Sequence, residues 1–340
     1  MLLFILIFVV IILEIIRNKK NEKIIFGLGI IAVFSFSAFR IYSGLDDAAY
    51  IELFTKLSSS NAFIINNFQE PLFQLLVKLL TIIPFEKSIF FLTSIISAIL
   101  FYKINVKVIG YSLIPLIFYT SHKFLHNDLN QIRQGVVSLG VLYLLVNHKS
   151  MQWFKGASLA GIHVLAILYF PIKLVINKIS LRSNLQILFL LLIGWLSGKI
   201  FNTLMGINIF NNMKLIYYLN DSRFNNSILL LTNFVFIKSV AIFIICIIAF
   251  RNLYSQNKSY KIIVDTYFLG ILTMIAFQNI EILSGRVSSL FFTSEPFLIY
   301  FLYQHLKLKS LRILFLPILL LAFAQLLYNL IFSKYTPIIL

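Results

Sequence analysis

The sequence predicts an all-α, polytopic membrane protein with about twelve transmembrane helices. Of the 340 residues, 60% are hydrophobic and only 12% are charged, and the mean hydropathy is +0.92. A water-soluble fold cannot hide so much apolar surface, because polar residues must cover most of its exterior. The apolar residues also form long runs that basic clusters separate, which is the pattern of successive membrane spans.

A helix needs about 20 residues to cross the hydrocarbon layer, or about 17 where the span is short. Ten predicted spans cover about 1–16, 24–41, 87–102, 108–121, 131–147, 184–205, 227–250, 261–280, 286–304 and 311–332. We interpret the apolar stretch from Gln152 to Asn177 as two short helices that break near His163, because only a pair keeps the lysines before and after it on one side. The total is twelve crossings, with both termini outside.

The basic residues predict the orientation of these spans. They form six clusters, which are Arg17/Lys19/Lys20/Lys23, Lys103/Lys107, Lys149/Lys155, Lys173/Lys178/Arg182, Arg251/Lys258/Lys261 and Lys307/Lys309/Arg312. In short membrane loops an excess of Lys and Arg marks the cytoplasmic side. The outer side then receives Asp46, Asp47, Glu52, Glu70, Asp128, Asp221 and Glu281. Glu22 falls in an inner loop.

Composition also excludes several classes of protein and site. The net charge of +17 is dispersed at predicted helix ends, so we expect no binding of nucleic acid. The single cysteine, Cys246, excludes disulfides and thiolate metal sites. The basic cluster after the first apolar run indicates a retained span and not a cleavable signal. Because no repeat, low-complexity tract or linker divides the chain, we expect one integral domain over residues 1–340.

Two longer outer segments are predicted, at about 42–86 and about 206–226. The first contains an apolar stretch from Leu72 to Pro84, but Lys78 lies in its middle. A lysine at the bilayer centre costs about 2.5–3.5 kcal/mol, so we expect this segment to be partly embedded and not to cross the membrane.

Half of the eight arginines lie on the predicted outer side, where retention in the cytoplasm does not explain them: Arg40, Arg133, Arg223 and Arg286. Guanidinium binds phosphate with two parallel hydrogen bonds and stays charged, whereas ammonium acts as a point charge. These arginines are therefore candidates to bind a phosphate or pyrophosphate at the outer leaflet. The alternative for each is a residue at the membrane interface that is paired with a neighbouring carboxylate.

Other polar residues lie on the same predicted side. Glu70 precedes Pro71 and is a candidate base, although a carboxylate there also suits the N-terminus of a helix. His163 has no polar neighbour in the sequence and is either a site residue or a core histidine. The densest polar interval, from His122 to Gly135, contains His126, Asn130 and Gln134 and predicts the wall of a polar pocket. His122 and His126 share a helical face, but we predict no bound metal.

Several of these elements together resemble the EpsG family and the Wzy-type O-antigen polymerases. The resemblance spans most of the chain. It rests on the interval from Arg40 to Tyr50, Glu70-Pro71-Leu72-Phe73, the element Asn130-Gln131-Ile132-Arg133-Gln134-Gly135, His163 at a bent helical pair, and Gly285-Arg286. The family typically shows a pattern similar to His-x-Ser-Ala after its histidine. This chain departs from that pattern with Val164-Leu165-Ala166.

The resemblance implies a membrane glycosyltransferase of O-antigen or exopolysaccharide biosynthesis, with a fold similar to the C-type glycosyltransferases and no cofactor. Donor and acceptor would be glycans linked to undecaprenyl pyrophosphate, polymerised at the periplasmic face of the bacterial inner membrane, with a chain-length regulator as a candidate partner. The expected pyrophosphate-binding residues are the four arginines above. The expected catalytic residues are Glu70 and His163 with Asp46 and Asp47, and the expected substrate-binding residues are Tyr50, His126, Asn130 and Gln134.

Two other classes of protein remain compatible with this pattern. A flippase or transporter of the same lipid-linked glycan also needs cations and many helices, although transporters often have duplicated halves and no duplication is visible here. A membrane O-antigen ligase or O-acyltransferase would share the topology.

Overall fold

The computed structural model describes residues 2–40, 44, 46–61, 70–83, 85–147, 152–176, 178, 181, 183–205, 228–305, 320, 322–324 and 326–327. Every regular element in these ranges is a helix, which confirms the predicted all-α class. The chain forms two compact units, one of Met1–Ile167 with Pro296–Leu340 and one of Leu168–Glu295. The predicted outer segment at about 206–226 lies outside the described residues, as does most of the predicted span 311–332.

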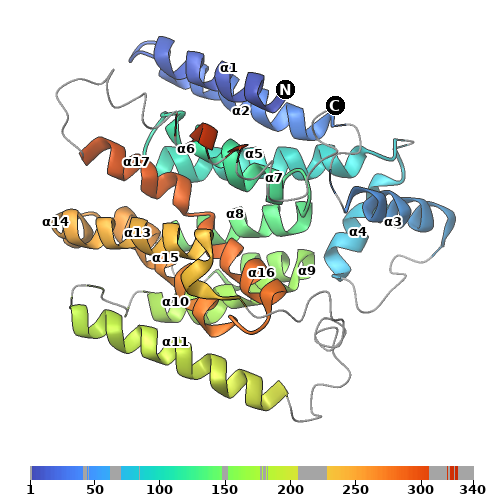
Figure 1. The fold of residues 1–340 in the computed structure, drawn as a ribbon. Helices are drawn as coiled ribbons and strands as arrows, with labels where there is room; N and C mark the ends of the chain where they lie inside the picture. The colour runs from blue at the N-terminus through green and yellow to red at the C-terminus, as the bar shows by residue number, and fades with distance from the viewer. Residues whose placement is uncertain are drawn as a thin grey trace. The chain divides into compact units, whose positions relative to one another are not determined.

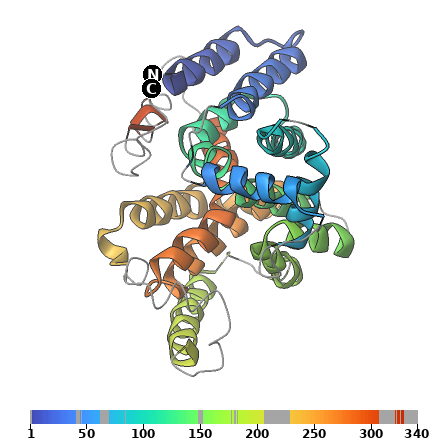
Figure 2. The ribbon, with the colours of Figure 1, turned by 90° about the vertical axis from the view of Figure 1, so that its right-hand side faces the viewer.

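The first unit contains helices from both ends of the chain (Figure 1). Its elements are α1 (Leu2–Ile16), α2 (Glu22–Ala38), α3 (Asp47–Ser59), α4 (Pro71–Leu80), α5 (Ser88–Val108), α6 (Ile114–Phe118), the π-helix η1 (Tyr119–Lys123), α7 (Phe124–Asn127), α8 (Ile132–Val146), α9 (Trp153–Ile162) and most of α17 (Glu295–His305). Most of the short 3-10 helix η2 (Val164–Leu168) follows, and this part of the unit ends at Ile167. Helix α5 packs against both α2 and α8, and α1 packs against α2 (Figure 2).

The second unit is built around one long helix, α15. Its elements are α10 (Tyr169–Ile176), α11 (Asn184–Met205), the 3-10 helix η4 (Leu230–Thr232), α13 (Phe234–Ala249), α14 (Arg251–Gln256), α15 (Lys258–Ala276) and α16 (Glu281–Phe292). Helix α15 packs against α11, α13, α14 and α16. A Cβ atom added at Gly198 would lie 2.4 Å from the Ala276 carbonyl oxygen, so the close approach of α11 and α15 requires a glycine there.

Two of the described helices, α5 and α15, are long and apolar enough to cross a membrane on length and composition. Several shorter apolar helices of 10–17 residues accompany them. The predicted count of twelve spans is therefore not confirmed. The predicted span 286–304 is divided into α16 and α17, because Pro296 lacks a backbone N–H and suits the first turn of a new helix.

The chain breaks at His163 as the sequence predicts. Helix α9 ends at Ile162, and His163 has extended backbone angles of φ −154° and ψ 130°. The 3-10 helix η2 and then α10 follow. The apolar run from Gln152 to Asn177 is thus not one continuous helix.

An internal ion pair joins the end of α2 to the start of α3. Arg40 Nη2 lies 2.9 Å from Asp47 Oδ1, and the two side chains are 1% and 2% exposed. Arg40 Nη1 also donates to the backbone carbonyl of Asp128, and its guanidinium lies 4.1 Å from the ring centre of Phe90. A buried charge that loses its partner costs several kcal/mol, so this pair fixes the course of the chain around it.

Gly44 is required beside this pair. A Cβ atom at position 44 would lie 2.2 Å from the Leu129 carbonyl oxygen. The Gly44 N–H donates to Asp47 Oδ2 at 3.0 Å, and the Asp46 N–H donates to Asn130 Oδ1 at 3.2 Å. The residues before α3 are therefore bound closely to the segment between α7 and α8.

A buried polar cluster surrounds Asp128. Tyr119 in the π-helix donates to Asp128 Oδ2 at 2.6 Å, and Ser37 Oγ donates to the Asp128 carbonyl at 2.9 Å. Burial raises the pKa of the Asp128 carboxyl to about 6, against the opposing effects of Tyr119, Ser97 and Arg40. This cluster and the Arg40–Asp47 pair hold α2, α3, α5 and α7 together at one end of the unit, which we name the site end.

The opposite end of the unit is basic. Helix α2 starts at Glu22 and reaches the site end at Ala38, about 25 Å further at 1.5 Å per residue. Helix α5 runs back from Phe90, beside Arg40, to Val108. The turns between α1 and α2 and between α5 and α6 therefore share one end, which we name the basic end.

The internal pair makes a prediction about stability. Arg40→Met and Asp47→Asn should each lower the free energy of unfolding by about 3–5 kcal/mol, because each leaves one buried group without its partner. The double variant Arg40→Met/Asp47→Leu should lose much less than the sum of the two. Thermal unfolding of the purified protein measures this. Glu52→Gln is the matched control, because the Glu52–Lys56 pair is 63% and 60% exposed and its loss should change little. Equal effects of Asp47→Asn and Glu52→Gln would contradict the account.

Candidate active site

A second ion pair at the site end is accessible. Arg133 Nη1 lies 2.5 Å from Glu70 Oε2, and the two side chains are 28% and 16% exposed. Glu70 precedes α4, and Arg133 lies in the first turn of α8. The pair thus joins residues that are 63 positions apart in the sequence. Unlike the Arg40–Asp47 pair, it can exchange one partner for a ligand without opening the core.

Aromatic rings support the Arg133 guanidinium. Its central carbon lies 5.6 Å from the ring centre of Tyr50 and 5.3 Å from that of Phe73. Both rings belong to an apolar core cluster that also contains Phe54, Val77 and Phe90. Burial raises the pKa of the Tyr50 hydroxyl, so this group remains a neutral donor. The Nε–H of Arg133 is buried without a hydrogen-bond partner, so the guanidinium keeps donor capacity beyond Glu70.

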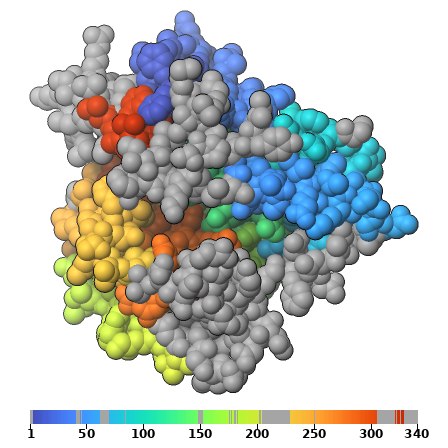
Figure 3. All heavy atoms as spheres, turned by 45° about the vertical axis from the view of Figure 1, so that its right-hand side comes forward, coloured from blue at the N-terminus to red at the C-terminus, as the bar shows by residue number. Residues whose placement is uncertain are grey.

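A lysine joins α4, which follows Glu70, to α3, which carries Tyr50. Lys78 in α4 donates from Nζ to the Leu57 carbonyl at 2.7 Å and to the Ser60 carbonyl at 2.5 Å. A cation at the C-terminal carbonyls of a helix is stabilised by the helix dipole, and α3 ends at Ser59. Lys78 therefore joins α4 to α3. Figure 3 shows that α3 forms part of the surface of this unit, in light blue.

His163 lies where α9 packs against α4. A Cβ atom at Gly161 would lie 2.8 Å from Leu72 Cβ, and Ile162 packs against the same apolar cluster as Tyr50 and Phe73. Leu72 is two residues from Glu70, and Gly161 is two residues from His163. His163 Nδ1 accepts a hydrogen bond from the Leu165 N–H at 3.2 Å. The structure thus brings α9, α4 and the Glu70–Arg133 pair to one region.

Three of the predicted substrate-binding residues, His126, Asn130 and Gln134, lie between α7 and the first turn of α8, whereas Tyr50 lies in α3. Asn130 is buried and accepts from the Asp46 N–H, and Gln134 is buried in α8 one residue after Arg133. The ring centre of His126 lies 5.4 Å from that of His122, in agreement with a shared helical face. Burial, with a smaller effect of Lys123, lowers the pKa of His126 to about 4, so its imidazole is neutral near pH 7.

Other predicted site residues are placed differently. Arg40 and Asp47 form the internal pair of the fold, so their roles toward a substrate remain predictions. Arg286 is partly buried in α16 of the second unit. Arg223 lies outside the described residues. In the described ranges, no group of three or more His, Cys, Asp or Glu side chains could hold a metal ion.

The sequence analysis missed two ion pairs in the second unit. Lys238 Nζ lies 2.7 Å from Glu295 Oε1, and Lys261 Nζ lies 2.6 Å from Asp265 Oδ2. Asp265 also accepts from the Tyr254 hydroxyl at 2.6 Å. The spacing of four between Lys261 and Asp265 indicates that pair. Glu295 precedes a proline as Glu70 does, so the repeated Glu-Pro dipeptide was a usable signal.

The site end therefore offers a part-exposed guanidinium, a carboxylate next to it and a histidine on a neighbouring helix end. Such groups can bind an anion and accept a proton from a nearby hydroxyl. They lie at one end of an apolar helical unit.

One known protein family matches nearly the whole chain. The family model of the EpsG family matches residues 23–339, nearly the whole chain. No curated protein and no solved structure matches the chain. The EpsG family is a membrane protein family of Wzy-like polymerases, which act in polysaccharide biosynthesis. The match over nearly the full length confirms the resemblance seen in the sequence, and the chain belongs to the EpsG family.

Proposed function

We propose that this protein polymerises oligosaccharide repeat units linked to undecaprenyl pyrophosphate, at the periplasmic face of the bacterial inner membrane. The observation that carries the proposal is the Arg133–Glu70 pair. It is accessible, it lies at the end of the unit opposite the basic turns, and its guanidinium has an unpartnered buried N–H. The family supports the class of reaction. We further propose that the chain crosses the membrane several times with these basic turns in the cytoplasm.

The reaction would consist of one transfer. An acceptor hydroxyl oxygen attacks the anomeric carbon of the donor glycan, and the bond between that carbon and the pyrophosphate oxygen breaks. Undecaprenyl pyrophosphate leaves with the electron pair, and the hydroxyl proton goes to Glu70. Arg133 stabilises the charge that develops on the pyrophosphate, and preorganised donors of this kind are often the largest contribution to catalysis.

The pair also suggests how binding activates the base. In the free protein Glu70 is held by Arg133 at 2.5 Å. A pyrophosphate that takes over the Arg133 donors competes with Glu70 for the guanidinium. The carboxylate then loses its cationic partner and becomes available to accept the proton of the acceptor hydroxyl. Substrate binding and base activation would thus be coupled through one arginine.

The geometry of His163 favours donation over proton abstraction. Because Nδ1 accepts the Leu165 N–H, the neutral ring carries its proton on Nε2. We therefore assign Nε2–H of His163 as a hydrogen-bond donor to substrate oxygen atoms and Glu70 as the base. The contact with Leu165 also fixes the ring at the start of η2.

Incubation of the purified protein with its lipid-linked repeat unit alone tests the class of reaction. A ladder of products that differ by one repeat unit is expected, without added nucleotide or metal. Glycan that changes leaflet without growing in length would instead indicate a flippase. Acyl transfer to the glycan would indicate an acyltransferase.

Arg133→Lys tests the binding of pyrophosphate. The change keeps the charge but removes the planar pair of donors. A hydrogen bond to a charged group contributes about 1.5–3 kcal/mol, so the rate of polymerisation should fall roughly 10- to 100-fold.

Glu70→Gln should lower the rate about 10²- to 10⁴-fold, because it removes the base. Glu52→Gln is the control, an exposed carboxylate on α3. A normal product ladder from Arg133→Lys and Glu70→Gln at wild-type protein levels would remove both residues from the mechanism.

Two substitutions of His163 separate its ring nitrogens. Glutamine carries its amide near the position of Nε2, and asparagine carries it near that of Nδ1. His163→Gln should therefore keep most of the polymerisation rate, whereas His163→Asn should lose up to about tenfold, the value of one hydrogen bond. The ratio of the two rates in the product-ladder assay is the measurement. A ratio near one, or a ratio that favours Asn, would refute donation from Nε2.

A further inference from the structure

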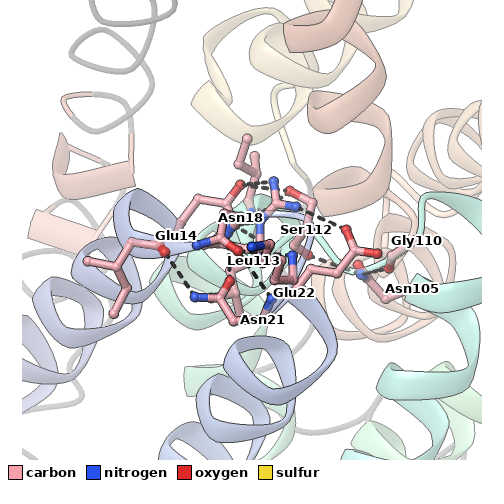
Figure 4. Close-up of polar contacts among 12 residues, drawn as sticks. Glu14, Asn18, Asn21, Glu22, Asn105, Gly110, Ser112 and Leu113 are labelled. Carbon is pink, nitrogen blue, oxygen red and sulfur yellow. Dashed lines mark hydrogen bonds and ion pairs between the residues drawn. The ribbon is translucent and has the colours of Figure 1, made fainter.

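The basic end of the first unit is a built structure and not a loose turn (Figure 4). The Glu14 carboxylate at the end of α1 accepts two hydrogen bonds from Arg17, at 2.9 and 2.8 Å. It also accepts from Ser112 Oγ at 3.2 Å and from the Leu113 N–H at 2.8 Å. One carboxylate thus joins the α1–α2 turn to the start of α6, and its charge is neutralised.

The turn between α5 and α6 is fixed as well. Gly110 has a positive φ of 103°, which favours glycine. Asn105 Nδ2 donates to the Gly110 carbonyl at 2.8 Å and to the Ser112 carbonyl at 3.0 Å. Figure 4 shows Asn105, Gly110 and Ser112 close to Glu14 and Glu22. The two turns therefore form one surface with a defined geometry.

Lysines surround this network. Lys19 and Lys20 are exposed between α1 and α2, and Lys23 Nζ lies 5.7 Å from the ring centre of Tyr111. Lys103 and Lys107 are exposed on the last turns of α5. Within the described part of the chain, no carboxylate lies within salt-bridge distance of Lys19, Lys20 or Lys23, and Glu22 lies 3.9 Å from Arg17.

Apolar side chains stand directly beside these lysines. Ile15 is 66% exposed, Ile16 51% and Ile24 68%. The Phe26 ring packs against Tyr102 and Tyr111, with ring centres 5.6 and 6.1 Å apart. In one leaflet of a bilayer, the phosphates lie outside and the acyl chains lie inside. The lysines match the phosphate layer, and the adjacent tyrosines and exposed isoleucines match the layers beneath it. A soluble anion would use the lysines but not the isoleucines.

We infer that the lysines of the basic end, Lys19, Lys20 and Lys23 with Lys103 and Lys107, bind the headgroup phosphates of anionic phospholipids, while the adjacent isoleucines contact the acyl chains. The inference depends on membrane association and not on the proposed transfer reaction. It adds a site at the end of the unit opposite Glu70 and Arg133. Because Glu14 and Glu22 both interact with Arg17, they leave the lysine charge available to lipid.

The test measures the association of spin-labelled phosphatidylglycerol, relative to phosphatidylcholine, with the full-length protein in phosphatidylcholine bilayers. Wild-type protein should select phosphatidylglycerol. One lysine near an anionic surface contributes about fivefold, so K19Q/K20Q/K23Q should lower this selectivity by at least about fivefold. K19R/K20R/K23R should retain it. The matched control, K155Q/K178Q/K258Q, removes the same charge from other predicted inner segments and should lower the selectivity clearly less than K19Q/K20Q/K23Q does.

Each contrary outcome has a distinct meaning. Equal losses in both triple Gln variants would show a general effect of positive charge and overturn the site. Absence of selectivity in the wild type would overturn it as well, and so would displacement of the lipid by inorganic phosphate, which would indicate a soluble anion. Helix content and elution volume must match the wild type in every variant. If K19Q/K20Q/K23Q folds poorly, the selectivity of K19R/K20R/K23R decides: retained selectivity supports the lipid site, and lost selectivity overturns it. Polymerisation measured in parallel distinguishes failure of this inference from failure of the proposed function.

Discussion

In a chain this apolar, each charged side chain inside the helical units must have a partner, and the degree of burial determines what the pair can do. The Arg40–Asp47 pair is 1% and 2% exposed and joins α2 to α3. Lys238–Glu295 and Lys261–Asp265 have carboxylates that are 5% and 0% exposed. The Arg133–Glu70 pair also joins a cation to a carboxylate, but its carboxylate is 16% exposed and its guanidinium 28%. Of these pairs, this one can exchange its partner most readily, which is why the proposed chemistry is placed there.

The antiparallel packing of α2 and α5 separates two surfaces with different chemistry. One end of each helix lies beside Arg40 and the buried cluster at Asp128, and the other lies beside Glu14 and the basic turns. The separation is about the thickness of the hydrocarbon layer, since α2 is about 25 Å long and that layer is about 30 Å thick. In the proposed orientation, the cation-rich turn binds one leaflet and the polar site lies at the other leaflet.

Patterns within short stretches of sequence predicted much of this structure. The run 184–205 is the helix α11 (Asn184–Met205), and the break at His163 is confirmed. Composition could not predict the number of spans, because breaks such as the one before Pro296 depend on a single residue inside an apolar run. The partners of the arginines depend on the fold: Arg40 binds a carbonyl that is 88 residues away, and Arg133 binds Glu70 across 63 residues. Residue type alone therefore predicts pyrophosphate binding for both arginines. In the structure Arg40 is 1% exposed and Arg133 is 28% exposed.

The central claim is that the Arg133–Glu70 pair faces away from the cytosol. Single cysteines introduced at Glu52, on the exposed side of α3, and at Lys20, in the basic turn, test it directly in a Cys246→Ser background. In intact spheroplasts, a membrane-impermeant maleimide should label Glu52→Cys at once and Lys20→Cys only after permeabilisation. Labelling of Lys20→Cys from outside, with Glu52→Cys protected until permeabilisation, would contradict the proposed orientation and with it the proposed site of polymerisation.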